Sequence, residues 1–126
     1  MSVLTQPPTM GDVLKYELNH NFTRETVTLL AGTSYAVGAV LGRITASGKM
    51  KLSTATGTDG AQNAAAVLLY DVDATAADTT GIVVLRGPAI VSKAALVFDA
   101  SVDDAAKKAA KHAQLTAIGI VPRDAA

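Results

Sequence analysis

The sequence predicts a mainly β (α+β) fold: a compact module of short strands with one clear C-terminal helix, preceded by an extended N-terminal arm. Short apolar runs rich in valine and isoleucine alternate with polar segments that contain glycine, a pattern typical of short strands joined by turns. One alanine- and lysine-rich segment carries the capping residues and the charge order of a helix. The length of 126 residues suits a single folded domain.

The first thirty residues are interpreted as the arm. Pro7 and Pro8 fix φ and donate no backbone hydrogen bond, so residues 6–11 are expected to form neither a helix nor a central strand. Strand-like patterns follow at residues 15–18 and 24–30, the second rich in β-branched side chains. We therefore predict two units. They are an N-terminal arm at residues 1–30 and a globular domain at residues 31–126.

The globular part is expected to contain several short strands. They are predicted at residues 35–44, 49–52, 64–72, 81–86 and 89–91. Ser47 and Gly48 have the composition of a hairpin turn, and the polar residues 53–63 and 74–80 are predicted as loops. Gly87 and Pro88 bend the chain, after which residues 89–91 are expected to return alongside the preceding strand.

The predicted helix follows Ser101. Ser101 is expected to be the N-cap, with Asp104 at the third helical position. Asp103 with Lys107, and Asp104 with Lys108, are spaced four residues apart in the orientation that favours ion pairs. Small side chains on one face permit close approach to a sheet or to a neighbouring subunit. This face consists of Val102, Ala106, Ala109 and Ala113.

Composition excludes several classes of function. The chain has 11 basic and 11 acidic residues, so no charge excess favours nucleic acid, and direct nucleic-acid binding is not expected. It has no cysteine, which excludes disulfides and thiolate chemistry. No apolar run is long enough to cross a membrane, and the N-terminus lacks the pattern of a signal peptide. Aromatic residues make up only 4% of the chain, so we expect a modest core that is helped by burial between subunits.

The acidic residues offer two candidate sites. Asp71 and Asp73 alternate near the end of a predicted strand, so both carboxylates face the same side and could bind a metal or transfer protons. Because no histidine lies nearby in sequence, a solvated strand end is favoured. Asp59 lies between glycines, but the segment lacks the repeated acidic ligands of a calcium loop and is interpreted as a turn.

The basic residues have structural interpretations as well. His112 is expected at the surface near the helix C-terminus, and His20 lies between two asparagines in the arm. Lys107, Lys108 and Lys111 are interpreted as a solvated helix face, because no aromatic residues interleave with them for base stacking. We therefore predict no catalytic, cofactor-binding or metal-binding residues and no cofactor, and the chain is not expected to be an enzyme.

Five segments together resemble the lambda-type bacteriophage head decoration protein family. The resemblance covers about residues 33–121 and is carried by their order and spacing. The segments are Tyr35-Ala36-Val37-Gly38-Ala39-Val40-Leu41-Gly42, Thr58-Asp59-Gly60-Ala61 followed by Ala65-Ala66-Val67-Leu68-Leu69, Gly81-Ile82-Val83-Val84-Leu85-Arg86-Gly87, Phe98-Asp99-Ala100-Ser101 with the helix after it, and Ala117-Ile118-Gly119-Ile120-Val121.

The resemblance implies a β-clip-like module that forms a homotrimer and acts as a cementing protein. Such a trimer would bind the outside of the phage head at local threefold axes and stabilise the expanded shell. It would be made in the host cytoplasm and would end on the outer surface of the virion capsid. The N-terminal arm would contact the major capsid protein. The capsid-binding residues are predicted to be Tyr16, Leu18, Phe22, Thr26, Val27, Thr28 and Leu29.

Two other classes of function stay open from the sequence. One is a different virion or surface structural module, such as a tail or adhesin domain. The other is a small trimeric β-rich hydrolase, which would require a dense acidic and glycine motif shared between subunits. We find no such motif in the sequence.

Overall fold

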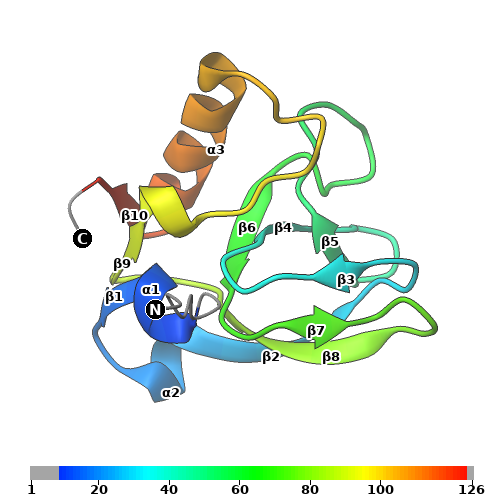
Figure 1. Ribbon diagram of the computed structural model, residues 1–126, viewed down its shortest axis with the longest axis horizontal. Coiled ribbons are helices and arrows are strands. Elements are labelled where there is room, and N and C mark those ends of the chain that lie inside the picture. Colours follow the sequence, from blue (N-terminus) through cyan, green and yellow to red (C-terminus); the bar gives the residue numbers. More distant parts are fainter. Residues whose placement is uncertain (1–8, 125–126) are drawn as a thin grey trace, which may run out of the picture.

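Two sheets and a five-stranded barrel share the core of the protein (Figure 1). The computed structural model describes residues 9–124. The elements in chain order are α1 (Met10–Val13), β1 (Leu14–Glu17), α2 (His20–Thr23), β2 (Arg24–Leu29), β3 (Ser34–Tyr35), β4 (Val40–Arg43), β5 (Met50–Leu52), β6 (Ala64–Leu68), β7 (Val72–Asp73), β8 (Thr79–Val84), β9 (Ala89–Ser92), the 3-10 turn η1 (Lys93–Ala95), α3 (Ala105–Ala117) and β10 (Ile120–Arg123). The predicted mainly β class with one clear C-terminal helix is confirmed.

The barrel closes in the order β2-β5-β4-β6-β8, because β2 pairs with β8 along its whole length and with β5 at its end. A second sheet has the order β1-β9-β10, and β3 pairs with β7. One core cluster fills the barrel and includes Leu29, Leu41 and Met50. The other contains Val84 of the barrel, Val91 of β9, and Leu115 of α3. In Figure 1, α3 stands beside β10, whereas β2 and β8 lie in the lower half of the view, with α2 below them.

Two of the predicted strands are each divided in the structure. Residues 35–44 contain the end of β3 and all of β4, separated by a turn in which Gly38 has φ +90°. A Cβ atom at Gly38 would lie 2.2 Å from the carbonyl oxygen of Ala95, so only glycine fits there. Residues 64–72 divide in the same way between β6 and the first residue of β7. The predicted hairpin is confirmed, because β4 and β5 pair antiparallel across Ser47 and Gly48.

The predicted return strand exists, but its predicted partner was wrong. β9 does not pair with β8; it pairs antiparallel with β1 and parallel with β10. The chain changes sheets at Gly87 and Pro88, where Gly87 packs against the backbone of Gly119. A Cβ atom at Gly87 would lie 1.9 Å from the Gly119 carbonyl oxygen. This close backbone approach joins the barrel to the second sheet.

The C-terminal helix begins later than predicted. Asp104, not Ser101, is the N-cap, and its carboxylate accepts a hydrogen bond from the backbone N–H of Lys107 at 2.8 Å. Ser101 donates instead to the Asp99 carboxylate and accepts a hydrogen bond from the backbone N–H of Ala55. The ion pair between Asp103 and Lys107 is confirmed at 2.9 Å.

The other predicted features of this helix were wrong in part. Asp104 does not pair with Lys108, because its carboxylate is turned toward the helix N-terminus, where it lies 4.0 Å from the Lys107 ammonium. The alanines of the predicted small-residue face are exposed, so in this chain they do not pack on a sheet. The buried side chains of α3 are Lys111 and Leu115.

Lys111 is buried rather than solvated, contrary to the sequence-based interpretation. Its ammonium donates hydrogen bonds to the carbonyl oxygens of Thr54 at 2.7 Å and Gln62 at 2.5 Å. The neighbouring Gln114 side chain accepts a hydrogen bond from the backbone N–H of Ala64 at 2.7 Å. Burial lowers the pKa of the Lys111 ammonium, which Asp99 partly offsets. These contacts fix the loop between β5 and β6 to α3.

The segment predicted as an arm folds in part with the rest of the molecule. Residues 1–8 lie outside the described residues. Residues 10–29 form α1, β1, α2 and β2, and both strands pair with strands from later in the chain. Residues 6–11 were predicted to contain no helix. This was wrong for Met10 and Gly11, because α1 begins at Met10. The backbone N–H of Thr9 donates to the Asp12 carboxylate at 2.8 Å and stabilises this single turn. None of the helices within residues 9–124 has the length and apolar character to cross a membrane.

The close contact at Gly42 gives a test of the fold. A Cβ atom at Gly42 would lie 2.1 Å from the carbonyl oxygen of Ala61, so Gly42→Ala forces the backbones of β4 and the 53–63 loop apart. We expect it to lower the free energy of unfolding by at least about 2 kcal/mol in urea titrations. Gly11→Ala is the matched control, because the added methyl group meets nothing closer than 3.8 Å. Equal stability of the two variants would contradict the contact.

Candidate interaction surface

Three exposed apolar side chains follow one another along β1, the residue after it and α2. Tyr16 is 50% exposed, Leu18 is 61% exposed and Phe22 is 54% exposed. We call them the β1–α2 surface. A chain with only five aromatic residues exposes two of them here, and aromatic side chains are enriched at protein interfaces. The remaining large apolar side chains that are exposed within residues 9–124 are Tyr70, Ile82, Val97 and Ile118.

Backbone contacts hold the β1–α2 surface in a defined position. The backbone N–H of Leu18 donates to the carbonyl oxygen of Pro88 at 3.0 Å, which continues the pairing of β1 with β9. Asn19 caps α2 by accepting a hydrogen bond from the backbone N–H of Asn21. The Arg86 guanidinium lies 5.5 Å from the centroid of the Phe22 ring and donates to the Phe22 carbonyl oxygen. The surface is therefore preorganised, which lowers the entropic cost of binding a partner.

A mostly buried ion pair joins the two ends of this segment. Arg24 at the start of β2 donates through Nε and Nη2 to the Glu17 carboxylate at the end of β1, at 3.0 and 2.5 Å. The Thr23 hydroxyl donates to the same carboxylate at 2.6 Å. Burial pushes the pKa of Glu17 upward, but the hydrogen bonds from Arg24 and Thr23 outweigh it and the pKa is lowered. The pair sets the direction in which α2 leaves the sheet.

β1 also presents an open sheet edge. It pairs with β9 on one side, and within residues 9–124 it has no strand on the other. The pairing with β9 is irregular between Leu14 and Tyr16. An edge strand offers unpaired backbone donors and acceptors to a second chain. The β1–α2 surface therefore combines apolar side chains with backbone groups that a partner strand can bind.

The structure does not bring all seven predicted capsid-binding residues to this surface. Tyr16, Leu18 and Phe22 form it, whereas Thr26 and Thr28 lie on the outer face of the barrel. Val27 and Leu29 are buried in the barrel core. They hold β2 in place and are not available to a partner in this fold, because consecutive residues of a strand point to opposite faces.

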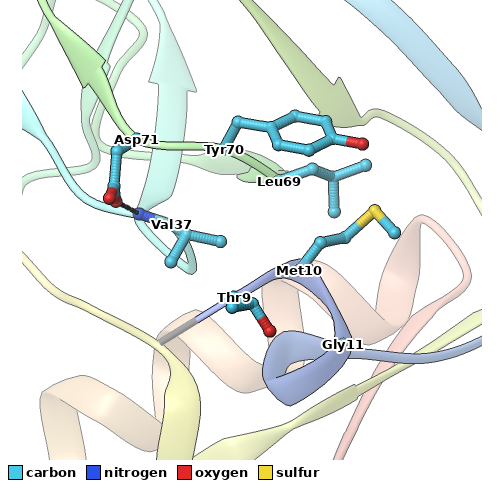
Figure 2. A pocket seen from close by; sticks show the side chains of 7 residues that line it. All are labelled: Thr9, Met10, Gly11, Val37, Leu69, Tyr70 and Asp71. Carbon is cyan, nitrogen blue, oxygen red and sulfur yellow. Dashed lines mark hydrogen bonds between the residues drawn. The ribbon is translucent and has the colours of Figure 1, made fainter. Parts of the chain in front are cut away.

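Sequence reasoning missed two exposed side chains, Tyr70 and Ile82. The apolar run at residues 81–86 does not alternate with polar residues, so it did not mark Ile82 as exposed; in the structure Val83 points into the barrel and Ile82 to the outer face. Nothing in the sequence marked Tyr70 either. It follows β6 in a loop whose direction depends on the hydrogen bond between Asp71 and the backbone N–H of Val37 (Figure 2).

The carboxylates of the acidic candidates accept hydrogen bonds from backbone N–H groups of the same chain. Asp71 accepts from Val37 at 2.8 Å, and Asp73 accepts from the backbone and the hydroxyl of Thr75, which lowers the pKa of Asp73. Asp59 pairs with Lys51 at 2.7 Å and accepts from the backbone N–H of Ala61, consistent with the predicted turn. Within residues 9–124 there is no group of three or more side chains suited to hold a metal ion.

His112 is half-buried, which corrects the expected surface position. Its ring meets the ring of Phe98 edge-on, with centroids 5.8 Å apart. Its Nε2 atom is buried and has no hydrogen-bond partner among the described residues. Burial lowers the pKa of His112, and the positive charges of Lys93 and Lys108 lower it further, against the opposing effect of Asp124. The exposed His20 lies at the start of α2, where it lines a hollow with Arg24 and Glu25.

Comparison with known protein families identifies a match that covers most of the chain. The family model described as bacteriophage lambda head decoration protein D matches residues 3–120. The match includes the β1–α2 surface, the barrel and the second sheet up to the first residue of β10. No curated protein sequence matches the chain.

The ion pair beneath the surface gives a prediction with a defined pH dependence. Glu17→Gln leaves Arg24 without its charged partner, and we expect the free energy of unfolding at pH 7 to fall by about 1 to 2 kcal/mol. Because the folded-state pKa of Glu17 is lowered, its contribution is present above the ordinary pKa of 4.5 and is lost as the pH falls through the folded value. The two proteins should therefore converge in acid. A constant difference down to pH 2 would contradict the assignment.

His112 gives a second prediction. Since its folded-state pKa is lowered from 6.5, the unfolded chain binds a proton more readily than the folded chain. The free energy of unfolding should fall as the pH drops below about 7, at no more than about 1.4 kcal/mol per pH unit, until the folded pKa is reached. We expect His112→Gln to remove this slope between pH 5 and 7, measured by urea titration. Both the wild type and the variant keep the exposed His20. If the free energy of unfolding of the variant still falls with pH at the wild-type rate, His112 is not the cause of the pH dependence.

Proposed function

The chain belongs to the bacteriophage lambda head decoration protein D family, and on that premise we propose that it binds the phage head as a homotrimer on local threefold axes and stabilises the expanded shell. As a member of this family it is a structural phage capsid decoration protein and a component of the virion. The proposal adds the oligomeric state, the position on the head and the effect on the shell.

We propose that the β1–α2 surface attaches the protein to the major capsid protein on the outside of the head. The observation that carries this proposal is that Tyr16, Leu18 and Phe22 are all at least half exposed yet held by backbone contacts and by the pair of Glu17 with Arg24. Apolar side chains on a fixed frame are typical of the central contacts of an interface. The open edge of β1 adds main-chain hydrogen bonds as a second source of affinity.

Three copies of a modest surface are sufficient for firm attachment. Once one subunit of a trimer has bound, the other two bind at a high effective concentration, so avidity exceeds the affinity of each contact. Equal numbers of acidic and basic residues give the chain no net charge to oppose association with copies of itself. The family match favours the head over the tail or adhesin alternative. Synthesis in the host cytoplasm, before assembly on the head, belongs to the same proposal.

Substitution of the surface tests attachment directly. Leu18→Asp and Phe22→Asp place a charge where an apolar contact is proposed, and we expect each to raise the dissociation constant for expanded heads that lack decoration protein by at least about 30-fold. Binding is measured by co-sedimentation with heads. Val97→Asp is the matched control, because Val97 is exposed but lies outside the β1–α2 surface.

Folding and assembly are followed in the same samples by circular dichroism and by mass in solution. The proposal for the attachment surface requires that both surface variants keep the fold and the mass of the wild type. If the folded variants bind heads as tightly as the wild type, the proposed attachment surface is wrong.

A further inference from the structure

Arg86 lies between β8 and β9 and contacts Phe22 of the β1–α2 surface. Its Nη1 atom donates a hydrogen bond to the Phe22 carbonyl oxygen at 2.5 Å, and its guanidinium carbon lies 5.5 Å from the centroid of the Phe22 ring. The Nη2 atom lies 3.2 Å from the Glu25 carboxylate. One guanidinium therefore contacts both the backbone and the ring of the same exposed aromatic residue, from a position 64 residues away in sequence.

The helical turn that carries Phe22 is too short to orient the ring by itself. α2 is a single turn of four residues, and Asn19 caps only its N-terminal end. A single helical turn is unstable in water, because forming the first turn fixes several backbone angles for one hydrogen bond. The Phe22 carbonyl lies near the C-terminal end, where helix carbonyls lack partners within the helix. Arg86 supplies that partner.

The backbone on both sides of Arg86 is fixed by hydrogen bonds. The N–H of Leu85 donates to the Thr23 carbonyl oxygen at 2.9 Å, and the N–H of Gly87 donates to the Ile118 carbonyl oxygen at 2.9 Å. The first bond joins the segment between β8 and β9 to α2, and the second joins it to the C-cap of α3. The Arg86 side chain therefore extends from a fixed backbone, so the fold defines where its guanidinium lies relative to the Phe22 ring.

An arginine suits this contact better than a lysine does. A guanidinium is planar, so it can lie over an aromatic ring while its N–H groups, held in a fixed fork, donate to separate acceptors. Here the acceptors are the Phe22 carbonyl and the Glu25 carboxylate. The Arg86 side chain is 37% exposed, so its pair with Glu25 contributes little to the free energy of unfolding. The contacts of Arg86 therefore bear on the orientation of the Phe22 ring more than on the stability of the fold.

We propose that Arg86 is a positioning residue for attachment to the head: it holds the Phe22 ring in the orientation that the major capsid protein binds. The proposal rests on the proposed function of the β1–α2 surface and adds a residue that acts through Phe22. Without Arg86 the ring is free to change rotamer, and binding must immobilise it at a cost in entropy. Affinity for the head should therefore fall although every apolar side chain of the surface is still present.

Removal of the guanidinium tests this role. We expect Arg86→Ala to raise the dissociation constant for expanded heads that lack decoration protein by about 5- to 10-fold, the effect of freeing one side chain, measured by co-sedimentation. Arg43→Ala is the matched control and should bind heads as the wild type does. Arg43 also donates to one backbone carbonyl, that of Gly48 at 2.8 Å, and its loss changes the net charge equally, but it lies in the β4–β5 hairpin.

Two further measurements separate positioning from a general loss of stability. The chain has two phenylalanines, so carbon-13 labels on the phenylalanine rings give NMR signals from Phe22 and Phe98 alone. In Arg86→Ala the Phe22 ring signals should shift, whereas those of Phe98 should stay in place. In a Phe22→Ala background, Arg86→Ala should raise the dissociation constant by less than about 2-fold, because no ring remains to be positioned.

A second variant covers the case in which Arg86→Ala does not fold, as judged by circular dichroism. Arg86→Lys keeps the charge but lacks the planar fork, so the Phe22 ring signals should again shift, and the dissociation constant should rise by about 3-fold. The same criteria then apply to this variant.

Each outcome decides the proposal. Wild-type binding by folded Arg86→Ala, or unshifted Phe22 ring signals, overturns it and leaves attachment through Phe22 standing. An equal loss of affinity with and without the Phe22 ring also overturns it, because Arg86 would then act on the shell directly. If Phe22→Ala alone binds heads as tightly as the wild type, the proposed attachment through this ring is wrong, and the positioning role fails with it.

Discussion

The closure of the barrel by β2 is the constraint on which the rest of the structure depends. β2 pairs with β8 at six consecutive positions, from Arg24 opposite Val84 to Leu29 opposite Thr79, and meets β5 at Met50. Without these bonds, β8 and β5 would be open edges and the cluster around Leu29 would face solvent. A strand from the first quarter of the chain thus completes the barrel, which is not closed without it.

This constraint also fixes the segment that precedes β2 and carries the proposed attachment surface. Because β2 is fixed on both sides, the residues before it are fixed as well, through the pair of Glu17 with Arg24 and the pairing of β1 with β9. Tyr16, Leu18 and Phe22 therefore lie on a segment whose backbone is held by the fold. Preorganisation lowers the entropy lost on binding. Under the proposed attachment, a small surface is sufficient when several copies act together.

The charged side chains of α3 show which features helical spacing predicts and which it does not. The ion pair of Asp103 with Lys107 follows from helical spacing alone and is present. The burial of Lys111 does not follow from spacing, because it depends on the carbonyl oxygens of Thr54 and Gln62, which arrive from a loop more than forty residues away. A buried ammonium is tolerated only where such acceptors meet it. The helix N-cap is Asp104 and not the predicted Ser101 for a related reason. The Ser101 hydroxyl forms hydrogen bonds with the Asp99 carboxylate and the backbone N–H of Ala55.

The sequence by itself determined the mainly β class, the hairpin at Gly48, the helix near the C-terminus and the family resemblance, because these depend on turn residues, on periodicity and on order along the chain. Seven residues were predicted from it to bind the capsid, and Tyr16, Leu18 and Phe22 are the large apolar ones among them that the fold leaves exposed. Only the tertiary structure decided that β9 joins a second sheet, that Val27 and Leu29 are core, and that Tyr70 and Ile82 share a face. The physical reason is that strand pairing and burial depend on contacts between distant segments, which local patterns do not encode.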